Sequence, residues 1–502
     1  MMLFIDGALC SFENLTSYEM KNSFLFLLAV VALGACQPTG PGVSDTAILI
    51  LNANVIDATS GNVHKEKAIL IDSGRIVSIG DGSELSALVG KEDVFDAGGR
   101  YVIPGLWDMH VHIEGEDLVE DNRALLPLYV AYGITTVRDC ASDLGELVLA
   151  WRDSINNDQL FGPQIFTAGS KLEGINSIWK GDLEIANEEE LEQMLDKLDE
   201  YNVDFVKITE NTLPGDLFLT SVKEARKRGY KVTGHVPYDL SVEELAAAGF
   251  SAIEHASYML RLGSDDSAIV DSIRSGKLAR SEAGQVYNSS FDQDSAFVRY
   301  KMLAERGVAV TPTLIGGKQL AYLDENNHQS DAYLKYLTDR FTSKYQWRID
   351  RMADETPEQK QGRKDRYQLI LEQLPYLHKA GVTLLAGSDA AALNTFVYPA
   401  QALHEELVLF QEAGLDPLTI LQTATVNGAK FFSVQDKLAG IVPGMEADLV
   451  ILNSNPLDDI SATQDIFAVV NDGEYLSRQK LDELLQRVQV IKEELDKGRK
   501  TE

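Results

Sequence analysis

Two histidines, His110 and His112, stand one residue apart at the end of the apolar segment VIPGLWDMHVH. Successive side chains of a strand point to opposite faces, so both imidazoles project from the same face and can reach one ion. His235 in YKVTGHVP and His255 in SAIEHAS also stand at or just past the end of a short apolar run. Neutral imidazole is a preferred zinc ligand, so this recurrence predicts a metal site rather than four unrelated structural histidines.

A lysine and an aspartate occupy the same kind of position, Lys207 in VDFVKITE and Asp389 in VTLLAGSDA. Burial beside cations disfavours the ammonium form of a lysine. The neutral amine can then add carbon dioxide, and the resulting carbamate offers two oxygen ligands and a negative charge. The alternative is a lysine whose head reaches solvent from the strand. We expect Lys207 to be carboxylated, and we expect Asp389 to act both as a metal ligand and as the acid–base group.

The elements that carry these residues alternate between apolar strands and amphipathic helices from Gly105 onward, for example the helix NEEELEQMLDKLDEYN. Eight strands with helical connections are typical of a (β/α)8 barrel, whose strand ends meet at one mouth and carry the catalytic groups. We therefore predict an α/β protein with a barrel over residues 105–435. The eight expected strands are residues 106–112, 133–140, 163–170, 203–210, 230–237, 251–257, 308–315 and 382–390.

Both ends of the mature chain are β-rich instead. Runs such as KAILIDSGRIVSIGD and EADLVILNSNPLDD contain short strands broken by glycine and aspartate. We expect residues 47–104 and 436–480 to complete one small β-sandwich beside the barrel, and residues 481–502 to form a helical tail.

The first residues are typical of export. Residues 20–36 contain a lone lysine, an apolar run and the tetrad LGAC. This run is short for a membrane span and predicts a signal peptide. The tetrad resembles a bacterial lipobox, in which Cys36 becomes the lipidated first residue. Met20 is then the start, residues 1–19 are an upstream misread and residues 37–46 are a tether. We expect a protein anchored by lipid only, at the outer membrane and facing the periplasm; the alternative is a buried core helix.

The composition limits the partners. The formal net charge is −32, from 77 acidic and 45 basic residues, which excludes nucleic acid and anionic membrane surfaces as natural ligands. Of the three cysteines, Cys10 and Cys36 belong to the removed or lipidated region, which leaves only Cys140 in the body of the mature chain. No internal disulfide is therefore expected, and we assign Cys140 to packing.

The segments VIPGLWDMHVH, FVKI, GHVP, IEHAS and AGSDA, with VPGMEADLVIL near the end, resemble the amidohydrolase superfamily, most of all its imidazolonepropionase-like and Xaa-Pro dipeptidase-like branch. The resemblance covers residues 47 to 475. It implies two divalent metal ions, usually zinc, at the barrel mouth. His110, His112 and Asp389 would hold the more buried ion, His235 and His255 the more exposed one, and carboxylated Lys207 would bridge them.

These residues predict hydrolysis of an amide-like C–N bond in a small molecule, such as a dipeptide, an N-acyl amino acid or a cyclic amide, by a hydroxide that bridges the two metals. Alternatives are a one-metal deaminase or cyclic-amide hydrolase of the same superfamily, and a surface lipoprotein that binds a ligand without catalysis. Homo-oligomerisation stays open.

Substrate contacts are less defined. Tyr238, three residues past His235, is a candidate donor to the substrate. Lys171, Lys180 and Arg261 are candidates to meet a substrate carboxylate, although cations on loops are usually only solvated. Residues 258–300 and 316–372 are longer than ordinary loops, and we expect them to form lids that restrict the site to small substrates.

Overall fold

The computed structural model describes residues 43–499. The predicted signal peptide, the lipidation site Cys36 and most of the predicted tether lie outside these residues, as do residues 500–502. Within the described part, no helix combines the length and the apolar character that a membrane crossing requires.

Both ends of the described chain contribute to one eight-stranded sheet, in the order β17-β16-β15-β5-β1-β2-β3, with β4 also paired to β1. The antiparallel pair β5 and β15 joins the two ends, with Val102 opposite Ile451. The sheet therefore unites the two predicted β-rich segments, whereas their arrangement as a sandwich stays a prediction. Its strands are β1 (Ile48–Ile56), β2 (Val63–Asp72), β3 (Arg75–Gly80), β4 (Val94–Asp96), β5 (Tyr101–Pro104), β15 (Leu449–Leu452), β16 (Ile466–Asn471) and β17 (Glu474–Ser477).

The middle of the chain forms parallel strands in two sheets, β6-β7-β8 and β10-β9-β11-β12-β13-β14. A hydrogen bond from Asp204 N to Thr167 O, 3.0 Å long, links the residues before β11 to the end of β8. The strands are β6 (Leu106–Val111), β7 (Ile134–Asp139), β8 (Gln164–Thr167), β9 (Leu172–Gly174), β10 (Leu183–Ile185), β11 (Val206–Ile208), β12 (Val232–Gly234), β13 (Ala252–Glu254) and β14 (Ala309–Thr311). Seven of the eight predicted strands thus contain a strand of the structure.

The eighth predicted strand, residues 382–390, makes only isolated bridges. Leu384 pairs with Val310 of β14, and Ala390 pairs with Val111 of β6, both in parallel. The segment therefore lies between the first and last parallel strands, as the prediction requires, but it is not a regular strand. Asp389 has φ +58°, which interrupts the extended backbone beside its pairing with β6.

Helices connect the parallel strands, and their sequences explain where they begin and end. In α4, the Asn187 side chain accepts a hydrogen bond from Glu190 N at the start, and the helix buries Leu191, Leu195 and Leu198. These connecting helices, with those that follow the last parallel segment, are α2 (Val119–Ala131), α3 (Gly145–Ile155), α4 (Glu188–Glu200), α5 (Gly215–Lys227), α6 (Val242–Ala248), α15 (Gln401–Glu412), α16 (Pro417–Thr423) and α17 (Val426–Phe432).

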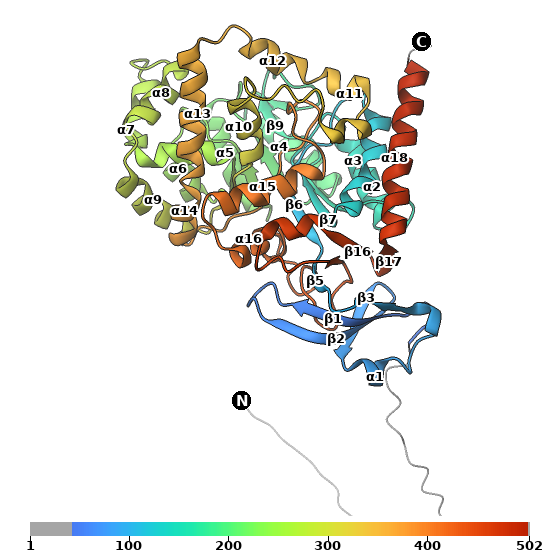
Figure 1. Ribbon diagram of the computed structural model, residues 1–502. Helices are drawn as coiled ribbons and strands as arrows, with labels where there is room; N and C mark the ends of the chain where they lie inside the picture. Colours follow the sequence, from blue (N-terminus) through green and yellow to red (C-terminus); the bar gives the residue numbers. More distant parts are fainter. Residues whose placement is uncertain (1–42, 500–502) are drawn as a thin grey trace, which may run out of the picture. The chain divides into compact units, whose positions relative to one another are not determined.

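The two long insertions are largely helical. Residues 258–300 contain most of η2 (Ala256–Gly263), then α7 (Asp266–Arg274), α8 (Arg280–Ser289) and the first part of α9 (Gln293–Glu305). Residues 316–372 contain most of α10 (Leu314–Ala321), then η3 (Ala332–Tyr336), α11 (Asp339–Ser343), α12 (Gln346–Met352) and α13 (Pro357–Leu371), and α14 (Leu374–Lys379) follows. Figure 1 shows α11 and α12 at the edge of the molecule opposite β1 and β2.

The remaining elements are α1 (Gly82–Leu85), η1 (Lys91–Asp93), η4 (Ile460–Gln464) and α18 (Arg478–Arg499). Helix α18 is the predicted helical tail, but it begins at Arg478, directly after β17. It packs along α2, seen as the red helix beside the cyan one in Figure 1.

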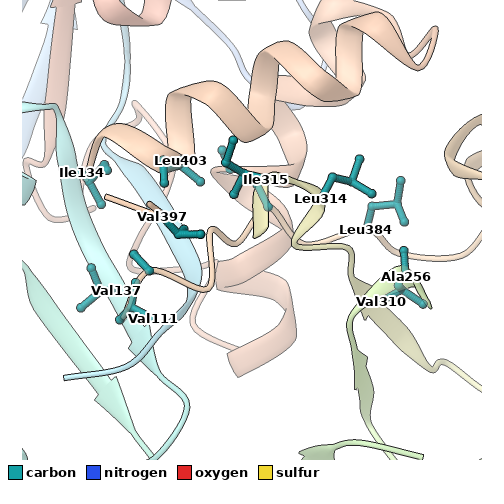
Figure 2. Close-up of a cluster of buried hydrophobic side chains, with 14 of the residues drawn as sticks. Val111, Ile134, Val137, Ala256, Val310, Leu314, Ile315, Leu384, Val397 and Leu403 are labelled. Carbon is teal, nitrogen blue, oxygen red and sulfur yellow. The ribbon is translucent and has the colours of Figure 1, made fainter. Parts of the chain in front are cut away.

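One large hydrophobic cluster fills the space between the parallel strands and the helices. Figure 2 shows part of it, where Val111 of β6 and Val137 of β7 lie in the same cluster as Leu403 of α15. All three are fully buried. Burial of this apolar surface holds the strand ends in fixed positions relative to one another, which is what a site built from several strands requires.

Candidate active site

The predicted site residues come together at the ends of the parallel strands. His110 belongs to β6 and His112 follows it, Lys207 belongs to β11, and His235 and His255 follow β12 and β13 directly. Asp389 lies on the segment that bridges β14 and β6, and its N–H donates to His110 O. All six predicted metal ligands therefore belong to one region, although they span most of the chain.

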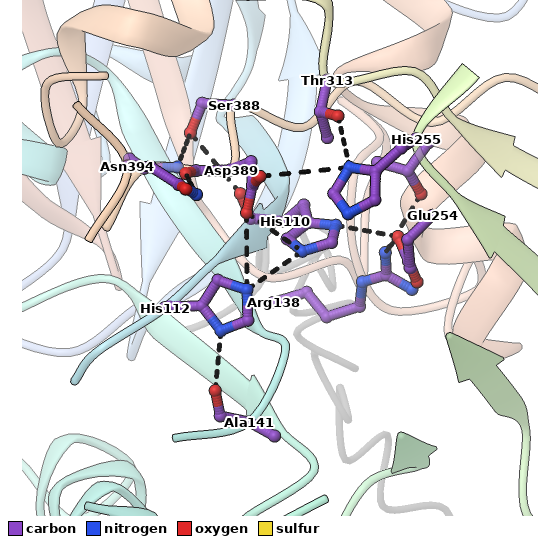
Figure 3. A network of polar contacts seen from close by, with 12 residues as sticks. His110, His112, Arg138, Ala141, Glu254, His255, Thr313, Ser388, Asp389 and Asn394 are labelled. Carbon is purple, nitrogen blue, oxygen red and sulfur yellow. Dashed lines mark hydrogen bonds and ion pairs between the residues drawn. The ribbon is translucent and has the colours of Figure 1, made fainter. Parts of the chain in front are cut away.

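The four imidazoles form two pairs, and within each pair the Nε2 atoms face each other. Figure 3 shows the pair of His110 and His112 beside Asp389. His110 Nε2 and His112 Nε2 are 3.3 Å apart, and each lies 3.4 Å from Asp389 Oδ1. His235 Nε2 and His255 Nε2 are 3.1 Å apart. Ligand atoms of His110, His255 and Asp389 all lie within 4.8 Å of one another.

The opposite ring nitrogen of each histidine has its own partner. Nδ1 of His110 lies 2.9 Å from Glu254 Oε2, and Nδ1 of His112 lies 2.7 Å from the carbonyl oxygen of Ala141. Since a carbonyl or carboxylate oxygen only accepts, each Nδ1 must carry the hydrogen, which leaves the lone pair on Nε2.

The second histidine pair repeats this arrangement. Nδ1 of His235 lies 2.9 Å from Glu210 Oε2, and Nδ1 of His255 lies 2.7 Å from Thr313 Oγ1. The carboxylate of Glu210 fixes the tautomer of His235 in the same way, and the Thr313 hydroxyl can accept from His255. Partners of this kind orient the histidines of metal sites and raise their basicity.

Burial keeps two of these imidazoles neutral. It lowers the pKa of His110 to about 4, with the charge of Lys207 acting in the same direction. Burial also lowers the pKa of His255 well below the ordinary value for histidine. Neutral imidazole is the form that binds metal ions.

Asp389 remains ionised among these rings. Burial alone would raise the pKa of Asp389, but its contacts with the imidazoles of His110 and His112 lower it far below its usual range. Its position depends on a strained backbone, with φ +58°. His255, Thr313 and Ala141 also have positive φ, of 73°, 49° and 81°, so unusual conformations gather around these side chains.

Lys207 is the most isolated polar group of the site. Its side chain is only 1% exposed, and its Nζ atom has no hydrogen-bond partner among the described residues. It lines the same cavity as His235, His255 and Asp389. A buried ammonium without a partner is unfavourable. A bound anion beside Nζ, or a chemical modification of the amine, would remove this cost.

Glu254 supports His110 through a direct contact, and no motif of the sequence predicted this role. Its Oε2 accepts from Arg138 Nη2 at 2.8 Å as well as from His110 Nδ1, and all three side chains are fully buried. Burial alone would raise the pKa of Glu254, but the charge of Arg138 lowers it well below the ordinary value. The carboxylate is therefore ionised, and its charge is balanced inside the protein.

Glu210 supports His235 in the same manner. It also accepts a 3.0 Å hydrogen bond from the hydroxyl of Tyr258. Burial would raise the pKa of Glu210, but its contacts with His235 and Tyr258 lower it to about 2. The only sequence signal for this role is its position, three residues past Lys207 at the end of the same strand.

A cavity of about 620 Å³ opens onto these residues. Its lining combines the site with the loop 171–180 and with Lys344 and Arg348 of the second insertion. The second insertion therefore borders the cavity, as expected for a lid, whereas no residue of 258–300 is among those that line it. A second cavity of about 260 Å³ meets the same place at His255, Asp389 and Arg348.

Tyr238, the predicted substrate contact, lines neither of these two cavities. Arg261 explains this, because Nη1 donates to the carbonyl oxygens of Val236 and Pro237 and so fixes the turn that follows His235. The tyrosine ring lies 5.8 Å from the Arg261 guanidinium and packs beside α8. A substrate contact by Tyr238 stays a prediction without support from its position.

The cations named from the sequence already have partners. Lys171 pairs with Asp182 at 3.0 Å, Lys180 with Glu116 at 3.6 Å, and buried Arg261 with Asp266 at 2.9 Å. Cys140 is buried, and burial raises the pKa of its thiol to about 12, which agrees with a packing role.

Comparison with known proteins identifies relatives of the chain. The sequence model of the amidohydrolase family matches residues 101–476. A 5-methylthioadenosine/S-adenosylhomocysteine deaminase of Teredinibacter turnerae is 34% identical over 87 residues, which are 16% of this chain and 20% of the relative. An adenine deaminase of Thermosipho africanus is 28% identical over 235 residues, which are 44% of this chain and 37% of the relative. The matched segments span less than half the length of these relatives.

Solved structures resemble the chain over most of its length. A bottromycin amidohydrolase superposes with a TM-score of 0.67 at 19% identity, over 89% of this chain and 91% of that chain. A Xaa-Pro dipeptidase with bound methionine gives a TM-score of 0.60 at 22% identity, over 86% of this chain and 100% of that chain. At these identities the likeness shows a shared α/β fold.

Proposed function

The chain belongs to the amidohydrolase family, and from that premise we propose that it is a metal-dependent hydrolase that cleaves an amide-like C–N bond in a small molecule. The observation that carries the proposal is the common orientation of the four imidazoles. Each has an oxygen partner at Nδ1 and turns Nε2 toward the other ring of its pair.

The donor set fits divalent metal ions. Two nitrogens that each lie 2.0–2.1 Å from a tetrahedral zinc ion are about 3.3 Å apart. The Nε2 atoms of His110 and His112 are 3.3 Å apart and those of His235 and His255 are 3.1 Å apart. Two lone pairs facing each other at this distance repel unless a cation lies between them.

We infer two ions, most simply zinc. His110, His112 and Asp389 would hold one, and His235 and His255 would hold the other. Lys207, carboxylated by carbon dioxide, would bridge both, which would give its buried and unpartnered Nζ a role. Bound cations of this kind lower the pKa of a water molecule and polarise a substrate carbonyl.

The protein's own groups supply the proton transfers. Asp389 stays ionised, because its surroundings lower its pKa, and it lies within reach of the cavity. It can accept a proton from the attacking water and pass it to the leaving nitrogen. The partly enclosed cavity limits the substrate to a small molecule such as a dipeptide, an N-acyl amino acid or a cyclic amide.

A one-metal deaminase or cyclic-amide hydrolase is the second candidate, and the deaminase names of the relatives in sequence favour it. In that case Lys207 would not bridge two ions. A ligand-binding lipoprotein without activity is the third candidate, and the complete set of six polar residues argues against it.

We further infer that the parallel strands close into a (β/α)8 barrel. The support is the hydrogen-bonded continuity from β6 through β14 and back to β6 across residues 382–390. We also propose export and a lipid anchor at Cys36 at the outer membrane, on the strength of the LGAC tetrad alone.

The test is a screen of zinc-loaded protein against dipeptides, N-acyl amino acids, cyclic amides and purines. Hydrolysis of an amide that is abolished in His110→Ala and in His235→Ala, with loss of bound metal and an intact fold, supports the proposal. His378→Ala, which removes an exposed histidine, is the matched control and should keep full activity. Full turnover in either site variant would refute the assignment.

A further inference from the structure

Apart from Lys207, which we assign to the metal bridge, Arg348 of α12 differs from the other cations that line the larger cavity. Lys171, Lys180 and Lys344 each form an ion pair, the last with Asp117 at 2.8 Å. Among the described residues no carboxylate forms an ion pair with Arg348. A partly buried guanidinium without an anion is unfavourable unless a ligand supplies one.

The hydrogen bonds of Arg348 leave one edge of its guanidinium free. Nε donates to Leu393 O at 3.1 Å, and Nη2 donates to Asn394 Oδ1 at 2.5 Å, so the side edge is occupied. Nη1 has no hydrogen bond within the described chain. The remaining edge, formed by Nη1 and Nη2, is the one that can bind both oxygens of a carboxylate.

The position of this edge is fixed relative to Asp389. The side-chain amide of Asn394 accepts from Arg348 and, through Nδ2, donates to Asp389 O at 2.7 Å. Arg348 also lines both cavities, which meet beside His255 and Asp389. An anion bound there would therefore lie where the two cavities meet, in the part of the cavity that Asp389 and His255 line.

The acidic residues of the cavity do not prevent this. Glu116 and Asp117 are paired with Lys180 and Lys344, and Asp143 accepts from the N–H groups of Gly115 and Glu116. Glu114 accepts from Leu393 N at 3.0 Å, and the charges of Glu114 and Asp389 act on Arg348 without an ion pair among the described residues. Outside the proposed metal site, Arg348 is therefore the cation of this cavity that remains available to an incoming anion.

We propose that Arg348 recognises a carboxylate next to the scissile C–N bond, so that the substrates are amides of amino acids with a free carboxylate. This inference rests on the proposed hydrolase function. It makes Arg348, contributed by the second insertion, a residue that selects the substrate.

The experiment compares two matched series on zinc-loaded protein. One contains N-acetyl-L-alanine, N-acetyl-L-leucine, N-acetyl-L-methionine and N-acetyl-L-phenylalanine. The other contains the corresponding N-acetyl amino alcohols, in which CH2OH replaces the carboxylate. We expect kcat/KM for the acids to exceed that for the alcohols by about 10- to 100-fold. Arg348→Gln should remove this preference through a higher KM for the acids, with the alcohols changed by less than about threefold, and Arg348→Lys should keep part of it.

Lys344→Gln is the matched control, because it removes a cation that lines the same cavity but already has a partner, and it should keep the preference. Equal losses for acids and alcohols in Arg348→Gln would mean that the arginine only holds α12 against residues 393–394, and would overturn the inference. Equal rates for both series in the wild type would also overturn it.

If neither series is cleaved, the proposed function has failed for these amides, and binding decides the inference separately. Calorimetry with the N-acetyl amino acids should then show binding that Arg348→Gln weakens at least tenfold. Binding that does not depend on Arg348, or no binding at all, would refute the carboxylate site.

Discussion

Glu254 Oε2 lies 2.9 Å from Nδ1 of His110, although the two residues are 144 positions apart in the sequence. Both side chains are completely buried, and Arg138 balances the charge of the carboxylate at 2.8 Å. The contact with Glu254 thus fixes the tautomer of His110, a proposed metal ligand inside the core. The orientation of His110 depends on a contact between distant strands and not on the strand that carries it.

Glu254→Gln is therefore expected to weaken both the fold and the metal site. The buried guanidinium of Arg138 loses its anion, which should cost about 3 kcal/mol of unfolding free energy. Zinc affinity should fall about 10- to 100-fold, because the amide no longer holds His110 as a carboxylate does. Thermal unfolding and competition with a chelator measure the two effects. Glu446→Gln, which breaks an exposed ion pair with Arg75, should change stability by less than about 1 kcal/mol. An unchanged zinc affinity in Glu254→Gln would contradict the positioning role.

Lys207→Met removes the buried amine and keeps much of the side-chain volume. Because Nζ has no partner in the described chain, the metal-free variant should be at least as stable as the metal-free wild type. Bound zinc should fall from two ions to at most one, and hydrolysis should fall at least about 1,000-fold, since a bridging anion is missing. Metal analysis and thermal unfolding provide the readouts.

Chemical replacement of the bridge offers an independent check on Lys207. In Lys207→Ala, zinc with millimolar propionate should recover part of the activity, and the same addition should leave the wild type unchanged. An unmodified Lys207 directed away from the metals in a fully active enzyme would refute the bridge and favour the one-metal candidate.

Asp448 gives the fold a predictable pH dependence outside the site. Burial raises the pKa of Asp448 to about 7, and its Oδ1 accepts from Asp472 N at 2.8 Å. The folded protein therefore binds the proton of Asp448 more tightly than the unfolded chain does. Protonated Asp448 adds to the free energy of unfolding, and this contribution is lost as the pH rises from about 4 to about 7.

Asp448→Asn imitates the protonated form, so its melting temperature relative to the wild type should rise by about 1–3 °C between pH 5 and pH 8. Scans at one fixed rate are needed, since a chain of this size can unfold irreversibly. The exposed Asp45→Asn serves as the control and should show no such trend. A difference in melting temperature between Asp448→Asn and the wild type that does not change with pH would contradict a raised pKa of Asp448.

Strand ends were the part of the site that the sequence could predict. A period of two and a terminal position placed His110, His112, Lys207, His235 and His255 at one rim, since parallel strands bring their carboxyl ends together. Asp389 was predicted to end a regular strand, but its positive φ belongs to an irregular segment.

The supporting residues could not be predicted in the same way. Glu254 and Arg138 face each other across strands, and nothing in a single sequence specifies which buried charges pair. Arg348 lies in the second insertion. The sequence pattern predicted helices there, but it could not predict that one of them borders the cavity. The position of Tyr238 outside both cavities could not be predicted either, because Arg261 fixes the turn behind His235 through hydrogen bonds that spacing along a strand does not reveal.

Cys36 lies outside the described residues, and its lipidation rests on the LGAC tetrad. Cys36→Ala should yield a protein that lacks lipid and appears in the soluble periplasmic fraction, while the wild type stays with the outer membrane. Osmotic shock followed by membrane fractionation measures the location of the protein, and mass spectrometry of the N-terminal peptide detects the lipid. Wild-type protein that is already soluble after osmotic shock would show that the tetrad is not a lipobox.

The number of zinc ions per chain tests the central claim most directly. Purified protein, saturated with zinc and then desalted, is analysed by inductively coupled plasma mass spectrometry against its protein concentration. The arrangement of His110, His112, Lys207, His235, His255 and Asp389 predicts two equivalents in the wild type, and one or fewer in His110→Ala and in His235→Ala. One equivalent in the wild type would contradict the two-metal site and favour the one-metal candidate, and none would contradict metal dependence altogether.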